Sequence, residues 1–407
     1  MYVRNRFVSL FLALCLIVSC AAMAQAAAAP AKFHVGIVTG TVAQGEDELR
    51  GAEAMIAEYG DVKDGGMIQH LTYPNNFAAE QETTISQIVS RATDPLVKAI
   101  VMNQAVPGAT EGFRRVREMR PDILLLAGVA HEDPLVIGKV ADFVMRNDFV
   151  SAGYRVIWAA KQLGADTFVH VSFPRHMSVE TLTRRRMIFE EACKDLGVKF
   201  VFETAPDPLS DVGVVGAQQY LLENVPKWVE TYGKNASFYC TNDAHTEPLI
   251  RQVAEFGGTF VEASLPSPLL GFPGALGIDL TNEKGNFPAI MKKIEDVLVE
   301  KGAGGRLGTW SFSFPFCATT GLIQHAINVI EGSSTMTNMQ DVLKAFGKYT
   351  PGAKWAGSYY VDGTTGERLN NYILLLQDTY IFGRGYIGSA ALDVPEKYLK
   401  ISSGLTK

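Results

Sequence analysis

The segment Phe33-His-Val-Gly-Ile-Val-Thr-Gly-Thr41 decides the fold, because an apolar strand-like run ends in a polar turn and a helical pattern follows at once. The same succession recurs along the chain. Strand-like runs are expected at 33–39, 67–73, 99–103, 123–127, 167–172, 199–203, 237–240 and 259–262. The segments between them, of roughly 15 to 30 residues, suit crossover helices, and continuously apolar runs suit strands covered on both faces. The sequence therefore predicts an α/β fold with parallel sheets.

The length of the chain favours two lobes rather than one. At 407 residues the chain exceeds the size at which a single hydrophobic core keeps growing. Residues 33–147 are expected to form an N-terminal α/β lobe, and residues 148–308 a second lobe of the same Rossmann-like kind.

The C-terminal part of the chain adds elements that must pack onto these two lobes. It holds helical patterns at 316–331 and 339–346 and strand-like runs at 355–361 and 372–382. We expect part of 309–350 to complete the first lobe and part of 351–400 to complete the second, so that each lobe is discontinuous in sequence.

The composition excludes some classes of partner. The chain has a formal net charge of -6 at pH 7 and a sequence pI near 5.7. Such a charge gives no general attraction to phosphate backbones or anionic lipids. We therefore expect no nucleic-acid partner, and we expect the protein to be a monomer.

Residues 1–29 have the features of a secretory signal peptide. Arg4 and Arg6 precede an uncharged, apolar run from Phe7 to Cys20, and an alanine-rich stretch with an Ala-x-Ala site follows. The apolar run is near the lower limit for crossing a bilayer, which favours a cleaved signal over a membrane anchor. The protein is therefore expected in the periplasm or another extracytoplasmic space.

The signal region contains a second pattern. Ile17-Val-Ser-Cys20 resembles the lipobox of bacterial lipoproteins, in which the cysteine is lipidated and becomes the new N-terminus. A lipid on Cys20 would hold the protein on a membrane surface without a spanning helix. The alternative is that Cys20 is an ordinary residue of the signal peptide, because competing alanine sites lie downstream.

Three cysteines follow the signal region, at Cys193, Cys240 and Cys317. They are widely spaced and lack the spacing of a metal site. One disulfide among them is possible, but the sequence does not assign it, and buried unreactive thiols are the favoured interpretation.

Polar residues that follow the expected strands form the candidate site. In an open α/β sheet, the loops outside the carboxyl ends of the strands line the crevice in which ligands bind. The candidates in the first lobe are Thr39, Thr41, Gln44, Tyr73, Asn103, Gln104 and His131. The candidates in the second lobe are Ser172, Arg175, His176, Asp207, Asn242 and Asp243.

Several of these residues have chemistry that suits a small polar ligand. Tyr73-Pro-Asn-Asn-Phe77 places two aromatic rings beside amides, which suits stacking on a flat ring or a sugar face. Arg175 and His176 precede a helix start and suit an anionic or carbonyl group. Asp207 and Asn242 suit ligand hydroxyls, although helix capping explains them equally well.

Two further clusters have structural explanations beside functional ones. Glu46, Asp47 and Glu48 follow the first turn and are expected to satisfy the start of a helix, where they would repel a phosphate. Trp310, Phe312 and Phe314 could form an aromatic wall of the site, although packing into the core is the commoner arrangement.

The sequence lacks the motifs of common hydrolases and metal enzymes. It contains no Gly-x-Ser-x-Gly elbow, no His-Glu-x-x-His and no paired-cysteine zinc pattern. His131-Glu-Asp133 has acceptable metal ligands, but adjacent loop residues rarely converge on one ion. We therefore expect no metal, no cofactor and no catalysis.

Two exported α/β lobes with ligand loops at facing edges resemble the type I periplasmic solute-binding proteins of bacterial importers. The sequence also resembles an uncharacterised family of exported bacterial proteins, many of them lipoproteins, over roughly residues 33–278. The segments that carry this resemblance begin at Val35, Gln44, Tyr73, Asn103, His131, Ser172, Ala205 and Thr241. A weaker likeness to the nucleoside-binding basic membrane lipoproteins implies a class of ligand.

These observations predict an extracytoplasmic solute-binding protein. It would trap a small polar ligand, such as a sugar or a nucleoside, between two lobes and present it to the membrane permease of an ABC-type importer. One alternative is a ligand-sensing domain that passes its closed state to a receptor. A third hypothesis is an exported hydrolase that uses His131 or His176 with a nearby carboxylate.

Overall fold

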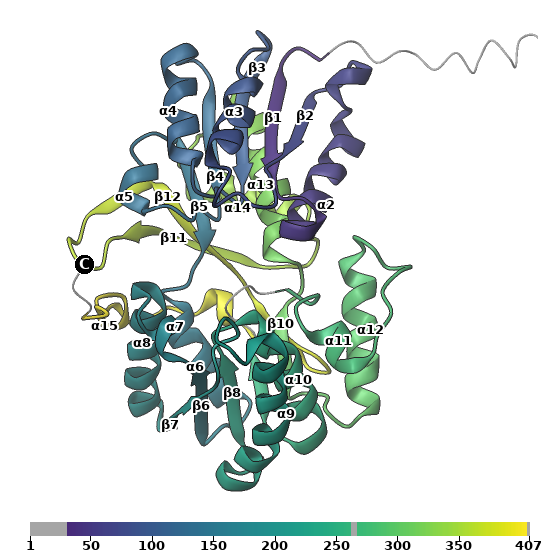
Figure 1. Cartoon of the computed structure of the whole chain (residues 1–407), viewed down its shortest axis with the longest axis vertical. Helices are drawn as coiled ribbons and strands as arrows, with labels where there is room; N and C mark the ends of the chain where they lie inside the picture. The colour runs from purple at the N-terminus through teal and green to yellow at the C-terminus, as the bar shows by residue number, and fades with distance from the viewer. Residues whose placement is uncertain (1–30, 262–266, 405–407) are drawn as a thin grey trace, which may run out of the picture.

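Two α/β lobes face each other across a gap (Figure 1). The computed structural model describes residues 31–261 and 267–404. The predicted signal peptide and Cys20 lie outside the described residues. Within the described ranges, every helix is too short or too polar to span a lipid bilayer.

The first lobe is built on a seven-stranded sheet with the order β11-β12-β5-β4-β3-β1-β2. All neighbours pair in parallel except the edge strand β11, which is antiparallel to β12. The strands are β1 (His34–Thr39), β2 (Ile68–Thr72), β3 (Val97–Asn103), β4 (Leu124–Gly128), β5 (Phe143–Asn147), β11 (Trp355–Val361) and β12 (Arg368–Gln377).

The second lobe has a sheet of the same size, with the order β14-β13-β10-β9-β8-β6-β7. Its strands β7, β6, β8, β9 and β10 pair in parallel, whereas β13 and β14 are antiparallel additions at one edge. The strands are β6 (Thr167–Ser172), β7 (Lys199–Thr204), β8 (Ala236–Cys240), β9 (Thr259–Val261), β10 (Leu307–Trp310), β13 (Thr379–Ile381) and β14 (Gly385–Tyr386).

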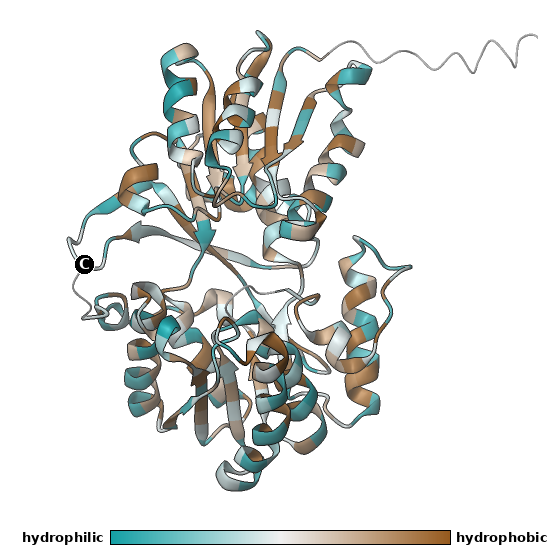
Figure 2. Cartoon of the chain, in the orientation of Figure 1, coloured by the Kyte–Doolittle hydropathy of each residue, from teal (hydrophilic) through white to brown (hydrophobic). Residues whose placement is uncertain are grey.

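Helices cover the sheets of both lobes (Figure 1). The first lobe carries α2 (Val42–Tyr59), α3 (Gln81–Arg91), α4 (Ala109–Met119), α5 (Pro134–Ile137), α13 (Phe314–Ile330) and α14 (Met339–Lys348). The second carries α6 (Ala152–Gln162), α7 (Pro174–Met177), α8 (Glu180–Leu196), α9 (Gly213–Tyr232), α10 (Asp243–Phe256), α11 (Phe272–Leu276), α12 (Phe287–Glu300) and α15 (Glu396–Leu399). Hydrophobic residues concentrate along the strands, and hydrophilic residues on the outer helix faces (Figure 2), as expected for sheets buried on both sides.

The α/β prediction is confirmed, and each predicted strand-like run before residue 262 contains a strand. The sequence analysis missed β5 and β10. It also treated 372–382 as one run, which is wrong. The run breaks at Asp378, whose carboxylate accepts hydrogen bonds from the Ser389 hydroxyl at 2.9 Å and from the Gly388 N–H at 3.1 Å.

This break moves the chain from one sheet to the other, because β12 pairs in the first sheet and β13 in the second. Within the described ranges the chain passes between the sheets at two further places, after β5 and after β10. In the range 351–400, therefore, β11 and β12 belong to the first sheet, and β13 and β14 to the second.

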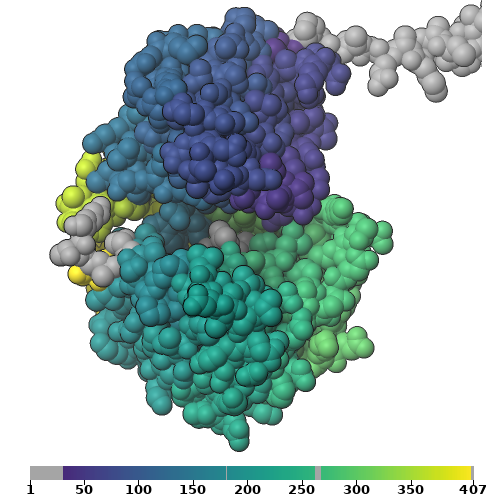
Figure 3. Space-filling view, viewed as in Figure 1, coloured from purple at the N-terminus to yellow at the C-terminus, as the bar shows by residue number. Residues whose placement is uncertain are grey.

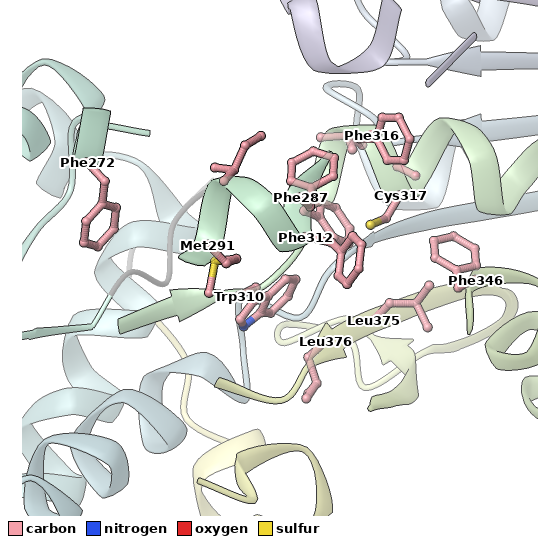
Figure 4. Packing of buried hydrophobic residues seen from close by; sticks show 14 of the residues in the cluster. Phe272, Phe287, Met291, Trp310, Phe312, Phe316, Cys317, Phe346, Leu375 and Leu376 are labelled. Carbon is pink, nitrogen blue, oxygen red and sulfur yellow. The ribbon is translucent and has the colours of Figure 1, made fainter. Parts of the chain in front are cut away.

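A hydrophobic core continues through the crossing region. Trp310, Phe312 and Phe314 are all less than 9% exposed, so they pack in the core and not on an open wall. Figure 4 shows Phe287 of α12 beside Phe312 and Phe316, with ring centroids 5.6 and 5.2 Å away. These contacts join the second lobe to α13, which covers the first sheet.

Cys193, Cys240 and Cys317 are all buried, and no disulfide joins them within the described residues, which confirms the favoured interpretation of buried thiols. Burial raises the pKa of Cys193 to about 12 and raises that of Cys317 well above its ordinary value. Because the thiolate is the reactive form, neither side chain is suited to nucleophilic chemistry.

Gly308 allows β10 and β13 to approach each other closely. A Cβ at this position would meet the Ile381 side chain and lie 2.6 Å from the carbonyl oxygen of Tyr380. We expect Gly308→Ala to lower the free energy of unfolding by about 1–3 kcal/mol. Gly347→Ala is the matched control, since no atom lies within 4 Å of its Cβ position in α14, and it should stabilise by about 0.5–1 kcal/mol. Urea denaturation measures both; equal effects would contradict this explanation.

Candidate functional site

The two sheets point the carboxyl ends of their central strands toward the same gap. In Figure 1, the start of α2 from the first lobe and α7 from the second both lie at this gap, and Figure 3 shows the surface hollowed between the lobes. The facing arrangement that the sequence analysis assumed is therefore present.

Two cavities of about 310 and 320 Å³ lie at the start of α2. Both are lined by Glu46 and Asp47 from the first lobe and by Leu269 from the second. We call this pair the α2 cavities. Their volumes fall near the lower end of small-molecule sites, which span about 300–1,000 Å³.

The remaining lining residues also come from both lobes. The smaller cavity adds Gly45, Glu48, Gln104, Ser267, Leu270 and Pro315. The larger adds Arg50, Pro273, Ile278, Asp279, Leu280, Thr281, Lys284, Gly285, Phe287, Ile290 and Phe316. The walls thus combine apolar side chains with carboxylates, one amide, two hydroxyl groups and, in the larger cavity, the cationic side chains of Arg50 and Lys284.

A distortion in α2 directs its acidic residues toward this space. Gly45 has non-helical backbone angles inside the helix, with φ -170° and ψ 73°. After the distortion, the Asp47 carboxylate accepts a hydrogen bond from the Ser313 hydroxyl, and Glu48 accepts one from the Gln104 amide at 2.8 Å. These acids were expected to satisfy a helix start. α2 begins at Val42 with no acidic residue in its first turn, but Glu46, Asp47 and Glu48 directly follow the break at Gly45 and so begin the helical segment beyond it.

Both carboxyl groups have perturbed acidity. Burial raises the pKa of Asp47 and of Glu48, and a neighbouring acid raises each further, Glu46 for the former and Asp47 for the latter. Hydrogen bonds from Ser313 and Gln104 act in the opposite direction without cancelling the effect. Groups with such shifts are common at functional sites.

The predicted residues after β1 mainly hold the neighbouring turns together. Thr39 is fully buried, and its hydroxyl is 2.8 Å from Nε2 of His70. Thr41 donates to the Asn75 side chain, and Gln44 donates to the Asn75 carbonyl oxygen at 2.7 Å. Both contacts fix the turn after β1 against the turn after β2.

Tyr73 and Asn103 are fully buried. Asn103 donates to the Pro315 carbonyl oxygen at 3.1 Å and to the Thr319 hydroxyl at 2.8 Å, which anchors the end of β3 to α13. The Tyr73 hydroxyl has no hydrogen-bond partner among the described residues. His131 lies beside Phe77, with ring centroids 6.2 Å apart, and burial lowers its pKa.

In the second lobe, Ser172, Thr241 and His176 form a chain of hydrogen bonds. The hydroxyl oxygens of Ser172 and Thr241 lie 2.7 Å apart, and Nδ1 of His176 lies 3.1 Å from the Thr241 oxygen. The His176 ring stacks near Phe173 at 4.1 Å. The turns after β6 and β8 are thereby joined at the gap.

Asn242 caps α10 by accepting a hydrogen bond from the Ala244 N–H at 2.9 Å. Asp243 follows it, and its side chain is exposed, yet protein crowds the carboxyl group closely enough to raise its pKa by desolvation. The Asp243 carboxyl group thus reaches solvent but is only partly hydrated, as expected for a residue at the rim of a cleft.

Arg175 and Asp207 pair with each other at an exposed rim. Nε and Nη2 of Arg175 donate to the two carboxylate oxygens of Asp207, at 2.6 and 2.8 Å. This hydrogen bonding lowers the pKa of Asp207 to about 2. A ligand anion at Arg175 would therefore compete with a carboxylate that is already bound.

We expect Arg175→Ala to return the pKa of Asp207 toward the ordinary value of about 3.9, because the main cause of the shift is removed. Carbonyl chemical shifts followed by NMR titration would measure the change. Arg50→Ala, which removes a partly buried guanidinium of the first lobe, should leave Asp207 titrating as before. An unchanged Asp207 titration in Arg175→Ala would contradict the ion pair.

Of the site residues predicted from the sequence, all of which are described, Gln104 lines an α2 cavity and the others do not. No hydrogen bond or ion pair within residues 31–261 and 267–404 joins a predicted residue of one lobe to one of the other. The sequence analysis did not include Asp47, Glu48, Ser267 and Ser313 in the candidate site. The run of three acids after the first strand was the sequence feature that could have indicated Asp47 and Glu48.

Sequence comparisons place this chain among uncharacterised bacterial proteins. A family model described as a protein of unknown function (DUF3798) matches residues 33–308, and a second family model matches 319–401. An uncharacterized protein of Treponema pallidum (strain Nichols) is 40% identical over 220 residues, which is 54% of this chain and 100% of that protein. A second protein of the same organism is 43% identical over 178 residues, 43% of this chain and 80% of its own length.

Solved structures share the architecture at low sequence identity. A candidate transcriptional regulator from Clostridium difficile 630 aligns with a TM-score of 0.78 at 22% identity, over 86% of this chain and 99% of that one. A sugar ABC transporter protein from Actinomyces odontolyticus ATCC 17982 aligns with a TM-score of 0.52 at 9% identity, over 89% and 98% of the two chains. These likenesses show the fold alone, which is that of the type I periplasmic binding proteins. Since the family model covers most of both lobes, the chain belongs to the DUF3798 family of proteins of unknown function.

Proposed function

We propose that this protein is an extracytoplasmic solute-binding protein that captures a small polar ligand between its lobes for an ABC-type importer. The observation that carries this proposal is the pair of α2 cavities, which residues of both lobes line at the carboxyl ends of β1 and β3. A ligand there would touch both lobes at once. It would therefore stabilise the closed arrangement over more open ones.

The polar groups of the cavities suit a ligand that donates hydrogen bonds. Asp47 and Glu48 offer carboxylate oxygens, and Gln104 offers an amide beside them. The sequence favoured a sugar or a nucleoside, and the hydroxyl groups of either can donate to such acceptors. Phe287 and Phe316 add apolar surface against which a ring can pack.

The cellular setting of the proposal rests on the predicted signal at residues 1–29. Export would place the protein beside a membrane permease, with Cys20 as a possible lipid anchor. A sensory domain that hands its closed state to a receptor would use the same fold and the same cavities. It differs in the partner that recognises the closed state.

The hydrolase hypothesis has less support from the site. A catalytic histidine needs a group that orients its ring. Within the described ranges, no hydrogen bond connects the His131 or His176 ring to an Asp or Glu side chain. The His176 ring instead contacts the Thr241 hydroxyl.

A thermal-shift screen of the purified protein against sugars, nucleosides, amino acids, amines and carboxylates tests the proposal. A ligand at 100 times its dissociation constant should stabilise the protein by about 2.7 kcal/mol. Gln104→Ala should abolish the shift, whereas Gln340→Ala, which changes an exposed glutamine of α14, should leave it intact. A shift that survives Gln104→Ala would place the ligand elsewhere, and no shift across the screen would contradict a solute-binding role.

A further inference from the structure

The α2 cavities contain two carboxylates without a cationic partner. Asp47 accepts a hydrogen bond from Ser313 and Glu48 from Gln104, both of which are neutral groups. Among the described residues, no Lys, Arg or His lies within 4.0 Å of either carboxylate. Two cationic residues, Arg50 and the exposed Lys284, line the larger cavity, whereas the lining of the smaller cavity contains no Lys, Arg or His. The Arg50 guanidinium pairs with Glu46 at 3.0 Å and Glu53 at 2.7 Å.

This arrangement is unfavourable in the absence of a ligand. Glu48 is 1% exposed, and Asp47 is its immediate neighbour. A buried carboxylate is ordinarily paired with a cation, because its loss of hydration must be offset. Desolvation raises the pKa of both groups, and no positive charge of the described chain opposes it. The smaller cavity, which both carboxylates line and no Lys, Arg or His lines, is therefore suited to receive positive charge.

Tyr73 provides a second and independent indication of a ligand. Its side chain is fully buried, and its hydroxyl has no partner within the described residues. The hydroxyl lies 2.9 Å from the position of a Cβ on Gly40, and the Gly45 amide nitrogen lies 3.0 Å from that same position. It therefore points at the turn that carries the acids, and the charge of Glu48 contributes to its raised pKa.

The walls of the cavities favour an organic cation over a metal ion. Leu269, Leu270 and Pro315 line the smaller cavity, and Phe287 and Phe316 line the larger. Calcium prefers six to eight oxygen ligands, and the described residues contain no group of three His, Cys, Asp or Glu placed to hold a metal. Apolar walls suit methylene groups, and aromatic rings also attract ammonium groups.

We propose that the solute carries a protonated primary amine, which Asp47 and Glu48 bind in the α2 cavities. This inference rests on the proposed solute-binding function and narrows its ligand class. The ammonium group would donate hydrogen bonds to the two carboxylates. The Tyr73 hydroxyl lies outside the cavity linings and would act on the site through the turn that carries the two acids.

Calorimetry and thermal shift at pH 7.5 with matched probes test the inference. The amine probes are putrescine, agmatine and glucosamine; the neutral controls are 1,4-butanediol and glucose. Amines should raise the melting temperature and the neutral controls should not. Asp47→Asn and Glu48→Gln should each weaken amine binding at least tenfold. Glu80→Gln, which changes an exposed acid outside the cavity linings, should bind as the unaltered protein does.

The unliganded variants give a readout that needs no ligand. Asp47→Asn and Glu48→Gln keep the shape of the side chains and remove an uncompensated charge, so both should unfold at or above the melting temperature of the unaltered protein. Lower melting temperatures would show that the charges serve the fold, and would overturn the inference. Tyr73→Phe should keep the melting temperature and weaken amine binding.

The outcomes separate this inference from the function on which it rests. Glucose or a nucleoside that binds and loses affinity in Gln104→Ala but not in Asp47→Asn or Glu48→Gln would overturn the amine and keep the solute-binding function. A shift with MgCl2 or CaCl2 that both acidic variants abolish would replace the amine by a metal ion. If none of the three amines changed the melting temperature, the inference of an amine ligand would also be overturned.

Discussion

Acidification from pH 7 to pH 5 is expected to remove roughly 3 to 6 kcal/mol of the free energy of unfolding, because three histidines are fully buried. His170, His245 and His325 are 0% exposed. Burial lowers the pKa of each, to about 4 for His245 and well below the ordinary value for His170. The folded state therefore binds fewer protons than the unfolded state below pH 6.5.

The direction of the effect follows from this difference in protonation. Above pH 6.5 both states leave the rings neutral, and stability does not change. Between pH 6.5 and the folded pKa only the unfolded state is protonated, so each histidine costs up to about 1.4 kcal/mol per pH unit. The raised pKa values of Asp47, Glu48 and Asp243 act the opposite way and moderate the loss.

His170 is the best single site at which to measure this effect. Its ring lies among aromatic side chains, 5.4 Å from the ring centroids of both Phe189 and Phe202. Neither ring nitrogen has a hydrogen-bond partner within the described residues. After burial, the charges of Arg185 and Arg186 further disfavour its protonation. Burial and the two arginine charges therefore favour the neutral ring.

Urea unfolding of His170→Phe at pH 7, 6 and 5 measures its contribution. The variant should lose less stability on acidification than the unaltered protein, by up to about 1.4 kcal/mol for each pH unit. Phe168→Leu is the control, because it alters the same core without removing a titratable group, and its loss should be equal at each pH. Identical pH profiles for His170→Phe and the unaltered protein would contradict the explanation.

Replacement of Gln377 is expected to lower the free energy of unfolding by roughly 2–5 kcal/mol, because its side chain holds two crossing segments together. Gln377 is 1% exposed at the end of β12. Its amide donates to the Phe312 carbonyl oxygen at 3.0 Å and accepts from the Phe312 N–H at 3.3 Å. Without it, two buried backbone groups would lose these partners.

Gln377→Met isolates the hydrogen bonds from the packing, since methionine has a similar length and no amide. We expect Gln377→Met to be nearly as destabilised as Gln377→Ala in urea unfolding, and Gln340→Met, at an exposed position, to change little. If Gln377→Met were as stable as the unaltered protein, the two hydrogen bonds would not be needed. The loss of stability would also measure how much the crossing after β12 and the crossing after β10 stabilise each other.

Much of the fold could be predicted because strands leave a local signal. A strand buried on both faces is a short apolar run, and the run from Val35 to Val38 carries that signal by itself. β5 was missed because Phe143-Val-Met-Arg-Asn147 is short and already contains polar residues. The break at Asp378 was missed because both sides of it are equally apolar. The strands on the two sides, β12 and β13, differ only in the sheet with which each pairs.

The candidate site could be predicted less well than the fold. Gln104 was placed at the site from its position after a buried strand, and it lines a cavity, although its role in binding stays a prediction. Arg175 and Asp207 were expected to face a ligand, but they lie close enough to neutralise each other. Sequence alone cannot show such a pairing, because 32 residues separate the two.

The sequence by itself determined the strand–turn–helix succession, the two-lobe size and the polar turns at strand ends, since each depends on residues close together in the chain. Tertiary structure alone decided that Asp47 and Glu48 face the gap. The hydrogen bond that orients Asp47 comes from Ser313, 266 residues away, and the lack of a cationic partner within the described residues could be recognised only once the neighbours of both acids were in place. Charge compensation is a property of the packed molecule, because desolvation depends on what surrounds a group in space.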